Sequence, residues 1–201
     1  MNPGLAAALL FALLLVVGVA AFMSVVTFNA LVALRQQINK AWANIDVALR
    51  QRHDELPNLV EAVRGQMQFE QMTLQRVTEA RAAWAPDAPI PAQATVSEAT
   101  SRAIRGLFAV VERYPDLHSD ANVMAIQAEV QRLEGIIADR RELYNDSVNR
   151  YNTRIAQVPG VFVASVLGWQ RRPFFKAEPG DEIRPPTSLL PDPEPEPGSR
   201  R

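Results

Sequence analysis

The chain has 201 residues, and its 21 Lys and Arg against 22 Asp and Glu give a formal net charge of −1. At roughly 100–200 residues per domain, this length predicts one soluble domain with additional segments. A near-neutral chain has no basic excess with which to replace counterions, so no nucleic-acid partner is expected. Cysteine is absent, which excludes disulfides, thiolate catalysis and Cys-ligated zinc. Only His53 and His118 remain for a His-based metal site, so no metal site is predicted.

The first segment, residues 1–29, is a predicted transmembrane anchor. Residues 2–34 carry no charge, and residues 5–28 contain only Ser24 and Thr27 as polar side chains. A helix over residues 5–28 is about 36 Å long, which exceeds a hydrocarbon core of about 30 Å. A cleaved signal peptide would have a basic start and a shorter apolar core. We therefore expect the lipid bilayer to be contacted through residues 5–28.

The orientation of this anchor follows from its flanks. No Lys or Arg precedes the apolar stretch, whereas Arg35, Lys40, Arg50 and Arg52 follow it. Basic flanks stay in the cytoplasm. The sequence thus predicts a single-pass protein with its N-terminus outside and its main domain cytoplasmic.

Residues 30–177 are predicted to form an all-α bundle, because apolar residues recur at three- and four-residue spacing and no alternation typical of strands occurs. Pro57, the Pro-rich stretch 85–94, Pro115 and Pro159 break the pattern. Amphipathic helices joined by short loops bury their apolar faces best against one another. The expected helices are about 30–54, 57–84, 95–113 and 119–157, followed by an apolar segment at 161–169.

Candidate capping residues support the expected N-termini of the third and fourth helices. Thr95 with Glu98 fits the capping-box pattern at the start of the third helix, and Ser119 or Asp120 is the expected cap of the fourth.

Pro57 leaves two topologies open. The apolar pattern continues through it almost unbroken, so residues 30–84 fit either one long kinked helix, about 80 Å in length, or a hairpin that turns at Asp54–Pro57. The hairpin gives a compact core and is preferred. It would also return the end of the fourth helix to the bilayer.

The segment that would then lie near the bilayer has dense apolar residues followed by aromatic residues beside basic ones. This composition suits the headgroup layer, but packing across the open end of the bundle is an equal alternative. The candidate membrane-surface or partner contacts are Phe162, Val166, Leu167, Trp169, Arg171, Arg172, Phe174 and Phe175.

Two charged residues, Glu70 and Arg81, fall on the apolar stripe of the expected second helix. They lie either at its rim or inside as paired charges. One hypothesis is that Glu70, Arg81, Glu134 and Arg141 form buried ion pairs that set helix register.

A repeated pair, Tyr144–Asn145 and Tyr151–Asn152, has a spacing of seven residues and therefore lies on one helix face. Tyrosine buries its ring while its hydroxyl stays at a polar rim. Core tyrosines with polar tips are preferred to a binding groove beside this helix. The final segment, residues 178–201, is acidic and proline-rich and is predicted to be disordered.

The combination of A-W-x-x-I-D-V at 41–47, L-P-N-L-V at 56–60 and the paired Y-N resembles the LemA family of bacterial membrane-anchored proteins, over about residues 28–178. The resemblance implies a single-pass protein of the bacterial inner membrane whose cytoplasmic part is an up-and-down antiparallel four-helix bundle, and it favours the hairpin at Pro57. It implies no established activity, cofactor or catalytic residue.

The sequence contains no P-loop, GxGxxG, HExxH or GxSxG motif, and His53 beside Asp54 fits a solvated helix end better than a catalytic group. We therefore predict no catalytic residue, no cofactor and no enzymatic activity. The expected role is an interaction or scaffold module at the inner face of the bacterial membrane, with an unidentified membrane or cytoplasmic protein, or a second copy, as partner. The alternative is a regulatory accessory subunit of a membrane enzyme, such as a protease complex, bound through Val161–Trp169.

Overall fold

The structure, a computed structural model, describes residues 3–65, 67 and 70–177, so the expectations for residues 1–2 and 178–201 lie outside it. Within the described ranges the secondary structure is helical and no strand occurs, which confirms the all-α fold class. The helices are α1 (Pro3–Arg64), α2 (Gln71–Ala82), α3 (Ile90–Val111), α4 (Pro115–His118), α5 (Ala121–Ala156) and α6 (Gly160–Val166).

Helix α1 continues through Pro57 to Arg64, so the expected turn at Asp54–Pro57 is wrong. Proline lacks the N–H that would bond the carbonyl four residues earlier, which here belongs to His53. Arg81 of α2 supplies the missing donor, because its Nε donates to the His53 carbonyl oxygen at 3.3 Å. Helix α1 ends at Arg64 and α2 begins at Gln71, so the expected helix 57–84 is divided between the end of α1 and α2.

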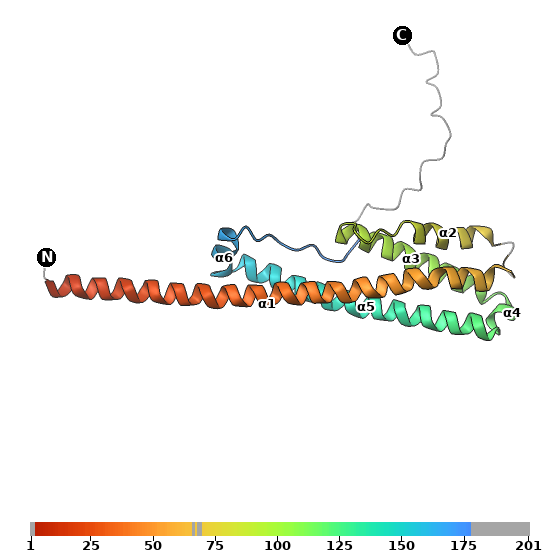
Figure 1. The fold of residues 1–201 in the computed structure, drawn as a ribbon, viewed down its shortest axis with the longest axis horizontal. Helices are drawn as coiled ribbons and strands as arrows, with labels where there is room; N and C mark the ends of the chain where they lie inside the picture. Colours follow the sequence, from red (N-terminus) through yellow and green to blue (C-terminus); the bar gives the residue numbers. More distant parts are fainter. Residues whose placement is uncertain (1–2, 66, 68–69, 178–201) are drawn as a thin grey trace, which may run out of the picture.

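Figure 1 shows that α5 runs antiparallel to α1 and returns to the middle of it. Helices α2 and α3 lie beside the far part of this pair, and α6 packs against both α1 and α5 at its near end. Residues 167–177, here called the strap, then run from α6 back toward α3. The near end of the fold is thus built from α1, α5, α6 and the strap.

The buried apolar residues form two clusters along this length. The far cluster joins α1, α2, α3, α4 and α5 around Leu59, Leu107 and Val130. The near cluster joins α1 and α5 to α6 and the strap around Leu31, Tyr144 and Phe175. The strap therefore closes the core where α2 and the body of α3 do not reach.

The start of α3 also differs from the expected capping box. Helix α3 begins at Ile90, with proline in its first turn, where a missing N–H costs nothing. Thr95 lies inside the helix, and its hydroxyl donates to the Pro91 carbonyl oxygen at 3.2 Å. The expected cap of α5 is confirmed at Asp120, whose carboxylate accepts from the backbone N–H of Asn122 at 2.8 Å.

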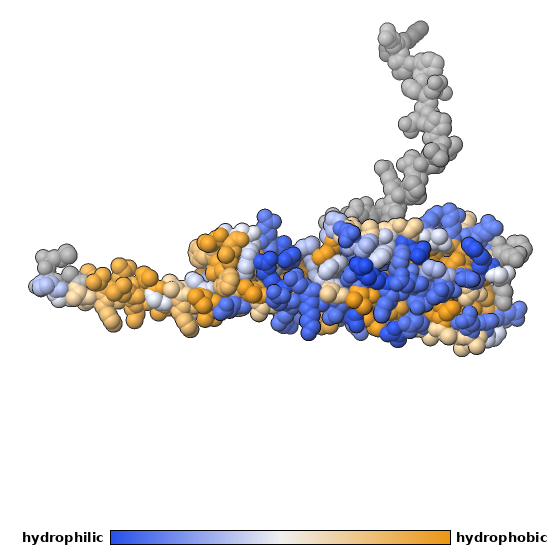
Figure 2. Space-filling view, in the orientation of Figure 1, coloured by the Kyte–Doolittle hydropathy of each residue, from blue (hydrophilic) through white to orange (hydrophobic). Residues whose placement is uncertain are grey.

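One described helix, α1, is long and apolar enough to cross a membrane by length and composition. Every residue from 7 to 26 is exposed. Figure 2 shows apolar side chains covering this end of α1 and continuing onto α6, whereas hydrophilic side chains cover much of the surface beyond it.

Candidate functional site

The candidate contact residues predicted from the sequence divide between α6 and the strap. Phe162 and Val166 are exposed on α6, and Leu167, Arg171 and Phe174 are exposed on the strap. Phe175 is buried, and Trp169 and Arg172 are half-buried. The segment thus presents α6 to its surroundings and packs the strap against the helices.

The strap is held to α5 by the repeated Tyr–Asn pairs. The Asn145 side chain accepts from the Phe175 N–H at 2.8 Å and donates to the Phe175 carbonyl at 3.3 Å. The Asn152 side chain does the same to Arg172, with both bonds at 2.9 Å. Each asparagine therefore satisfies both backbone groups of one strap residue, as a neighbouring strand would.

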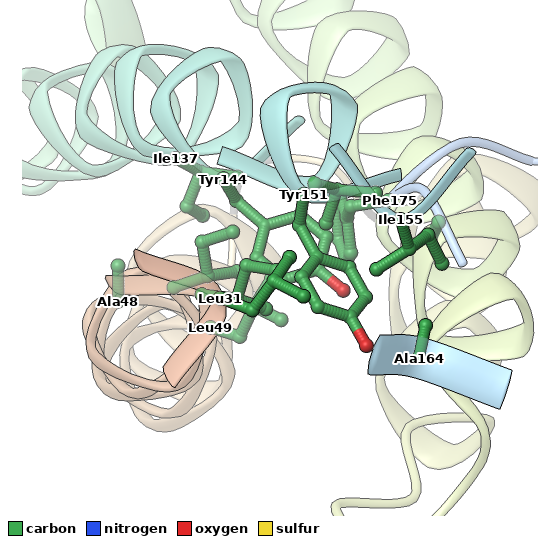
Figure 3. Packing of buried hydrophobic residues seen from close by; sticks show 13 residues of the cluster. Leu31, Ala48, Leu49, Ile137, Tyr144, Tyr151, Ile155, Ala164 and Phe175 are labelled. Atoms are coloured by element: carbon green, nitrogen blue, oxygen red, sulfur yellow. The ribbon is translucent and has the colours of Figure 1, made fainter. Parts of the chain in front are cut away.

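The tyrosines of the two pairs complete this ladder. The Tyr144 hydroxyl donates to the Pro173 carbonyl at 2.9 Å, and the Tyr151 hydroxyl donates to the Gln170 carbonyl at 3.3 Å. In Figure 3 both rings lie within the near cluster, beside Leu31 and Leu49 of α1. The tyrosines are core residues with bonded polar tips.

The spacing of the ladder has a geometric reason. Partners seven residues apart on α5 bind strap residues three apart, namely Arg172 and Phe175 or Gln170 and Pro173. Seven helical residues rise about 10.5 Å, and three extended residues span about 10 Å. Tyr–Asn pairs repeated every seven residues on a helix are therefore spaced to bond every third residue of an extended chain that runs antiparallel to the helix.

Side chains of the strap seal this end of the core. Phe175 packs near Trp42, with ring centroids 5.9 Å apart, and Trp42 meets Tyr144 edge to face at 5.8 Å. Burial raises the pKa of Tyr144 to about 12, with the nearby Arg172 charge acting in the opposite direction. The Tyr144 hydroxyl is thus a neutral structural donor.

The four charged residues proposed as buried ion pairs do not pair with one another. Glu70 contacts Arg113 at 3.1 Å, and Arg141 contacts Glu98 at 3.5 Å, both near the surface. Arg81 bonds the His53 carbonyl, as described above. Glu134 alone joins a buried cation, and that cation is Arg52.

Arg52, predicted from the sequence only as part of the basic flank, is a buried charge. Its side chain is 4% exposed and contacts Glu134 at 2.6 Å, and its guanidinium also donates to the hydroxyls of Ser97 at 2.9 Å and Ser101 at 3.0 Å. The network joins α1, α3 and α5. Its signal was present in the sequence, because Arg52 lies four residues from both Ala48 and Leu56 on the apolar stripe.

His53 follows Arg52 and faces Trp84, with ring centroids 4.6 Å apart. Burial, together with the charge of Arg81, lowers the pKa of His53, and Asp54 opposes this effect. Its Nδ1 is buried without a hydrogen-bond partner among the described residues. The expected solvated helix end is therefore wrong, because His53 lies half-buried inside α1 and its ring packs on Trp84.

Surface grooves also lie between helices of the described part of the chain. A groove of about 420 Å³ separates α1 from α6, and one of about 880 Å³ separates α2 from α3. The larger is lined mainly by alanines and Gly106, with Arg76, Glu79 and Arg102 at its rim.

These features define an all-α protein in which a helix of membrane-spanning length continues into the core and a C-terminal strap closes one end. Residues 41–188 match the LemA family, and the chain belongs to that family.

An 80-residue stretch is 32% identical to magnetosome proteins MamQ 1 and MamQ 2 of Paramagnetospirillum magneticum. It is 30% identical to magnetosome protein MamQ of Magnetospirillum gryphiswaldense. Each match covers 40% of this chain and 29% of the relative, so the chain spans under a third of the length of these curated relatives.

Proposed function

We propose that this protein is a non-enzymatic, single-pass interaction or scaffold module of the LemA type, held at the inner face of the bacterial cell membrane by α1. One observation carries the proposal. The exposed apolar stretch of α1, residues 7–26, continues without a break into the amphipathic stretch that packs against α5. Exposed apolar surface of this extent is costly in water and favourable in lipid.

In this proposal the second half of α1 forms an up-and-down four-helix bundle with α2, α3 and α5. The far cluster, shared by these helices, supports that arrangement. Because α1 belongs to both the anchor and the bundle, the bundle projects from the bilayer along the axis of α1. Its surface is therefore held at a fixed distance from the membrane and is available for contact with a partner.

The proposed orientation has the N-terminus outside and the bundle in the cytoplasm. The basic flank supports it, although Arg52 is buried against Glu134. Lys40 and Arg50 are exposed at this flank, and Arg35 is half-buried. The positive-inside rule retains such residues on the cytoplasmic side.

The anchor and its orientation are tested with single-cysteine variants, since the chain contains no cysteine. Gly4→Cys and Met124→Cys are probed with a membrane-impermeant maleimide in intact bacteria, with the parent chain as control. We expect both variants in the carbonate-resistant membrane fraction, Gly4→Cys labelled in intact cells and Met124→Cys only after lysis. A soluble protein, or the reversed labelling pattern, contradicts the proposal.

The interaction role is tested by photo-cross-linking in intact membranes. A photoreactive residue replaces Arg102 at the α2–α3 groove, and Glu142 on the exposed face of α5 is the matched control. We expect one discrete protein adduct from position 102 and none from position 142. No protein adduct from position 102, or equal adducts from positions 102 and 142, contradicts the interaction role. A third chain carries the photoreactive residue at the exposed Val166 of α6. An adduct with a membrane enzyme at position 166 and none at position 102 would instead favour the regulatory-subunit alternative.

A further inference from the structure

Helix α6 is an apolar surface feature without charge. From Ile155 to Gln170 the sequence has no charged side chain. Val166 is 85% exposed and Phe162 is 65% exposed. The opposite side of α6 is packed, because Gly160 and Ala164 are buried, and a Cβ at Gly160 would collide with the Arg154 carbonyl. The helix therefore has an inner face of small residues and an outer face of large apolar ones.

The outer face of α6 adjoins the apolar stretch of α1. The groove of about 420 Å³ between the two helices is lined by Ser24, Val25 and Phe28 from α1 and by Phe162, Val163, Val166 and Leu167 from α6 and its end. Ser24 satisfies its own hydroxyl by donating to the Ala20 carbonyl at 2.8 Å. The groove thus offers an almost wholly apolar surface to an occupant.

Trp169 and Arg35 lie at the end of this groove that is farther from the N-terminus of α1, here called its upper end. The Trp169 ring stacks on Phe28 with centroids 5.8 Å apart, and the Arg35 guanidinium lies 4.5 Å from the Trp169 ring centre. Side chains of a helix point toward its N-terminus, so Arg35 reaches back toward the apolar stretch. Trp beside Arg is the arrangement found where hydrocarbon meets lipid headgroups.

The position of α6 is fixed from both sides. Helix α6 packs on α1 and α5, and the ladder from Asn152 and Tyr151 holds the strap directly after it. The apolar face is therefore part of the folded structure.

We propose that α6 is a lipid-binding foot, and that the α1–α6 groove takes an acyl chain of the leaflet from which α1 emerges. The proposal rests on the anchoring of α1. Its occupant follows from continuity, because Ser24 and Val25 belong to the same apolar stretch that enters the bilayer, so whatever fills the groove shares the hydrocarbon layer. Arg35 at the upper end is placed to meet the lipid phosphate.

The test uses the full chain, with single cysteines carrying an environment-sensitive fluorophore, in vesicles of phosphatidylcholine and phosphatidylglycerol that include brominated lipids. The fluorophore at Val166→Cys measures lipid contact of α6, and that at Phe11→Cys measures lipid contact of the anchor. The fluorophore at Met124→Cys measures lipid contact at the far end of the bundle. We expect strong quenching by lipids brominated near the headgroup end of the chain at position 166, quenching by deeper bromines at position 11, and none at position 124.

A second variant separates the foot from the anchor. Adding Phe162→Glu to the Val166→Cys chain is expected to reduce quenching at position 166 severalfold, while the same change leaves the Phe11→Cys signal unchanged. Absence of quenching in the Phe11→Cys chain without Phe162→Glu would refute the anchor itself. Quenching at position 11 without quenching at position 166 overturns the foot and leaves the anchor intact. A signal at position 166 that varies with protein concentration and ignores bromine overturns it in favour of a second copy as occupant.

Discussion

Arg81 donates its Nε hydrogen to the carbonyl oxygen of His53 at 3.3 Å, and this is the carbonyl that Pro57 leaves without a helical donor. A proline inside a helix removes one hydrogen bond and disfavours the helix by roughly 3 kcal/mol. Here a side chain of α2 replaces the lost backbone donor. The contact explains how α1 passes through Pro57, and why Arg81 lies on the inward side of α2.

The first prediction concerns coupling between these positions. Arg81→Ala is expected to destabilise the chain by about 1–2 kcal/mol, because it leaves a backbone carbonyl of α1 without its donor. In a Pro57→Ala background the backbone supplies that donor again, so the same substitution should cost roughly half as much or less. Urea unfolding of the four chains in detergent, followed by circular dichroism, measures the coupling energy. Equal costs of Arg81→Ala in both backgrounds would show that the contact does not compensate for the proline.

The second prediction uses the asymmetric burial of Arg52 and Glu134. The Arg52 side chain is 4% exposed, but that of Glu134 is 26% exposed. Glu134→Ala leaves a buried guanidinium without its carboxylate and should cost about 3 kcal/mol. Arg52→Met leaves a carboxylate that water reaches and should cost less. The control is the ion pair between Glu70 and Arg113 near the surface. Glu70→Ala should change the free energy of unfolding by at most about 1 kcal/mol. A smaller loss for Glu134→Ala than for Arg52→Met contradicts this account of the network.

The third prediction is that the asparagine ladder protects individual strap amides. Asn152→Ala removes two hydrogen bonds to Arg172, worth about 1 kcal/mol each. The Arg172 amide should therefore exchange with deuterium on the order of 30-fold faster, because each 1.4 kcal/mol is a factor of ten. The Phe175 amide, held by Asn145, should change less. Asn149→Ala, at an exposed position of the same helix, is the matched control. Unchanged exchange at Arg172 in the Asn152 variant would mean that the ladder does not hold the strap.

The fourth prediction concerns alkaline pH. Burial raises the pKa of Tyr144 to about 12, whereas an unfolded tyrosine titrates near pH 10. Between these values the folded chain retains a proton that the unfolded chain has lost, so its stability falls as pH rises from about 10 to 12. Below pH 10 the contribution is constant. Unfolding midpoints measured across this range should fall more steeply for the parent chain than for Tyr144→Phe. Identical slopes would show that Tyr144 titrates normally in the fold.

The sequence pattern predicted the all-α class, the Asp120 cap and the tyrosine core, because each depends on local spacing or on one side chain bonding its own helix. It failed at Pro57, since the compensating donor, Arg81, comes from another helix. Pairing of Arg52 with Glu134 was likewise invisible, although the stripe position of Arg52 indicated burial. The hydrogen bonds to the strap require the seven-residue spacing of the Tyr–Asn pairs on α5 and an extended segment beside them. The sequence showed the seven-residue spacing, but not that the strap would lie extended along α5.

The central claim is that anchor and bundle share one uninterrupted helix, so that the bundle stands on the bilayer at a fixed height. The most direct measurement is the distance between spin labels at Phe22→Cys and Val47→Cys in the full chain in lipid nanodiscs, both of which are exposed positions on α1. A continuous helix places these backbones about 37 Å apart at 1.5 Å per residue, and a single narrow distribution near that value is expected. A broad distribution, or a markedly shorter distance, would show a break at the membrane surface and contradict the account.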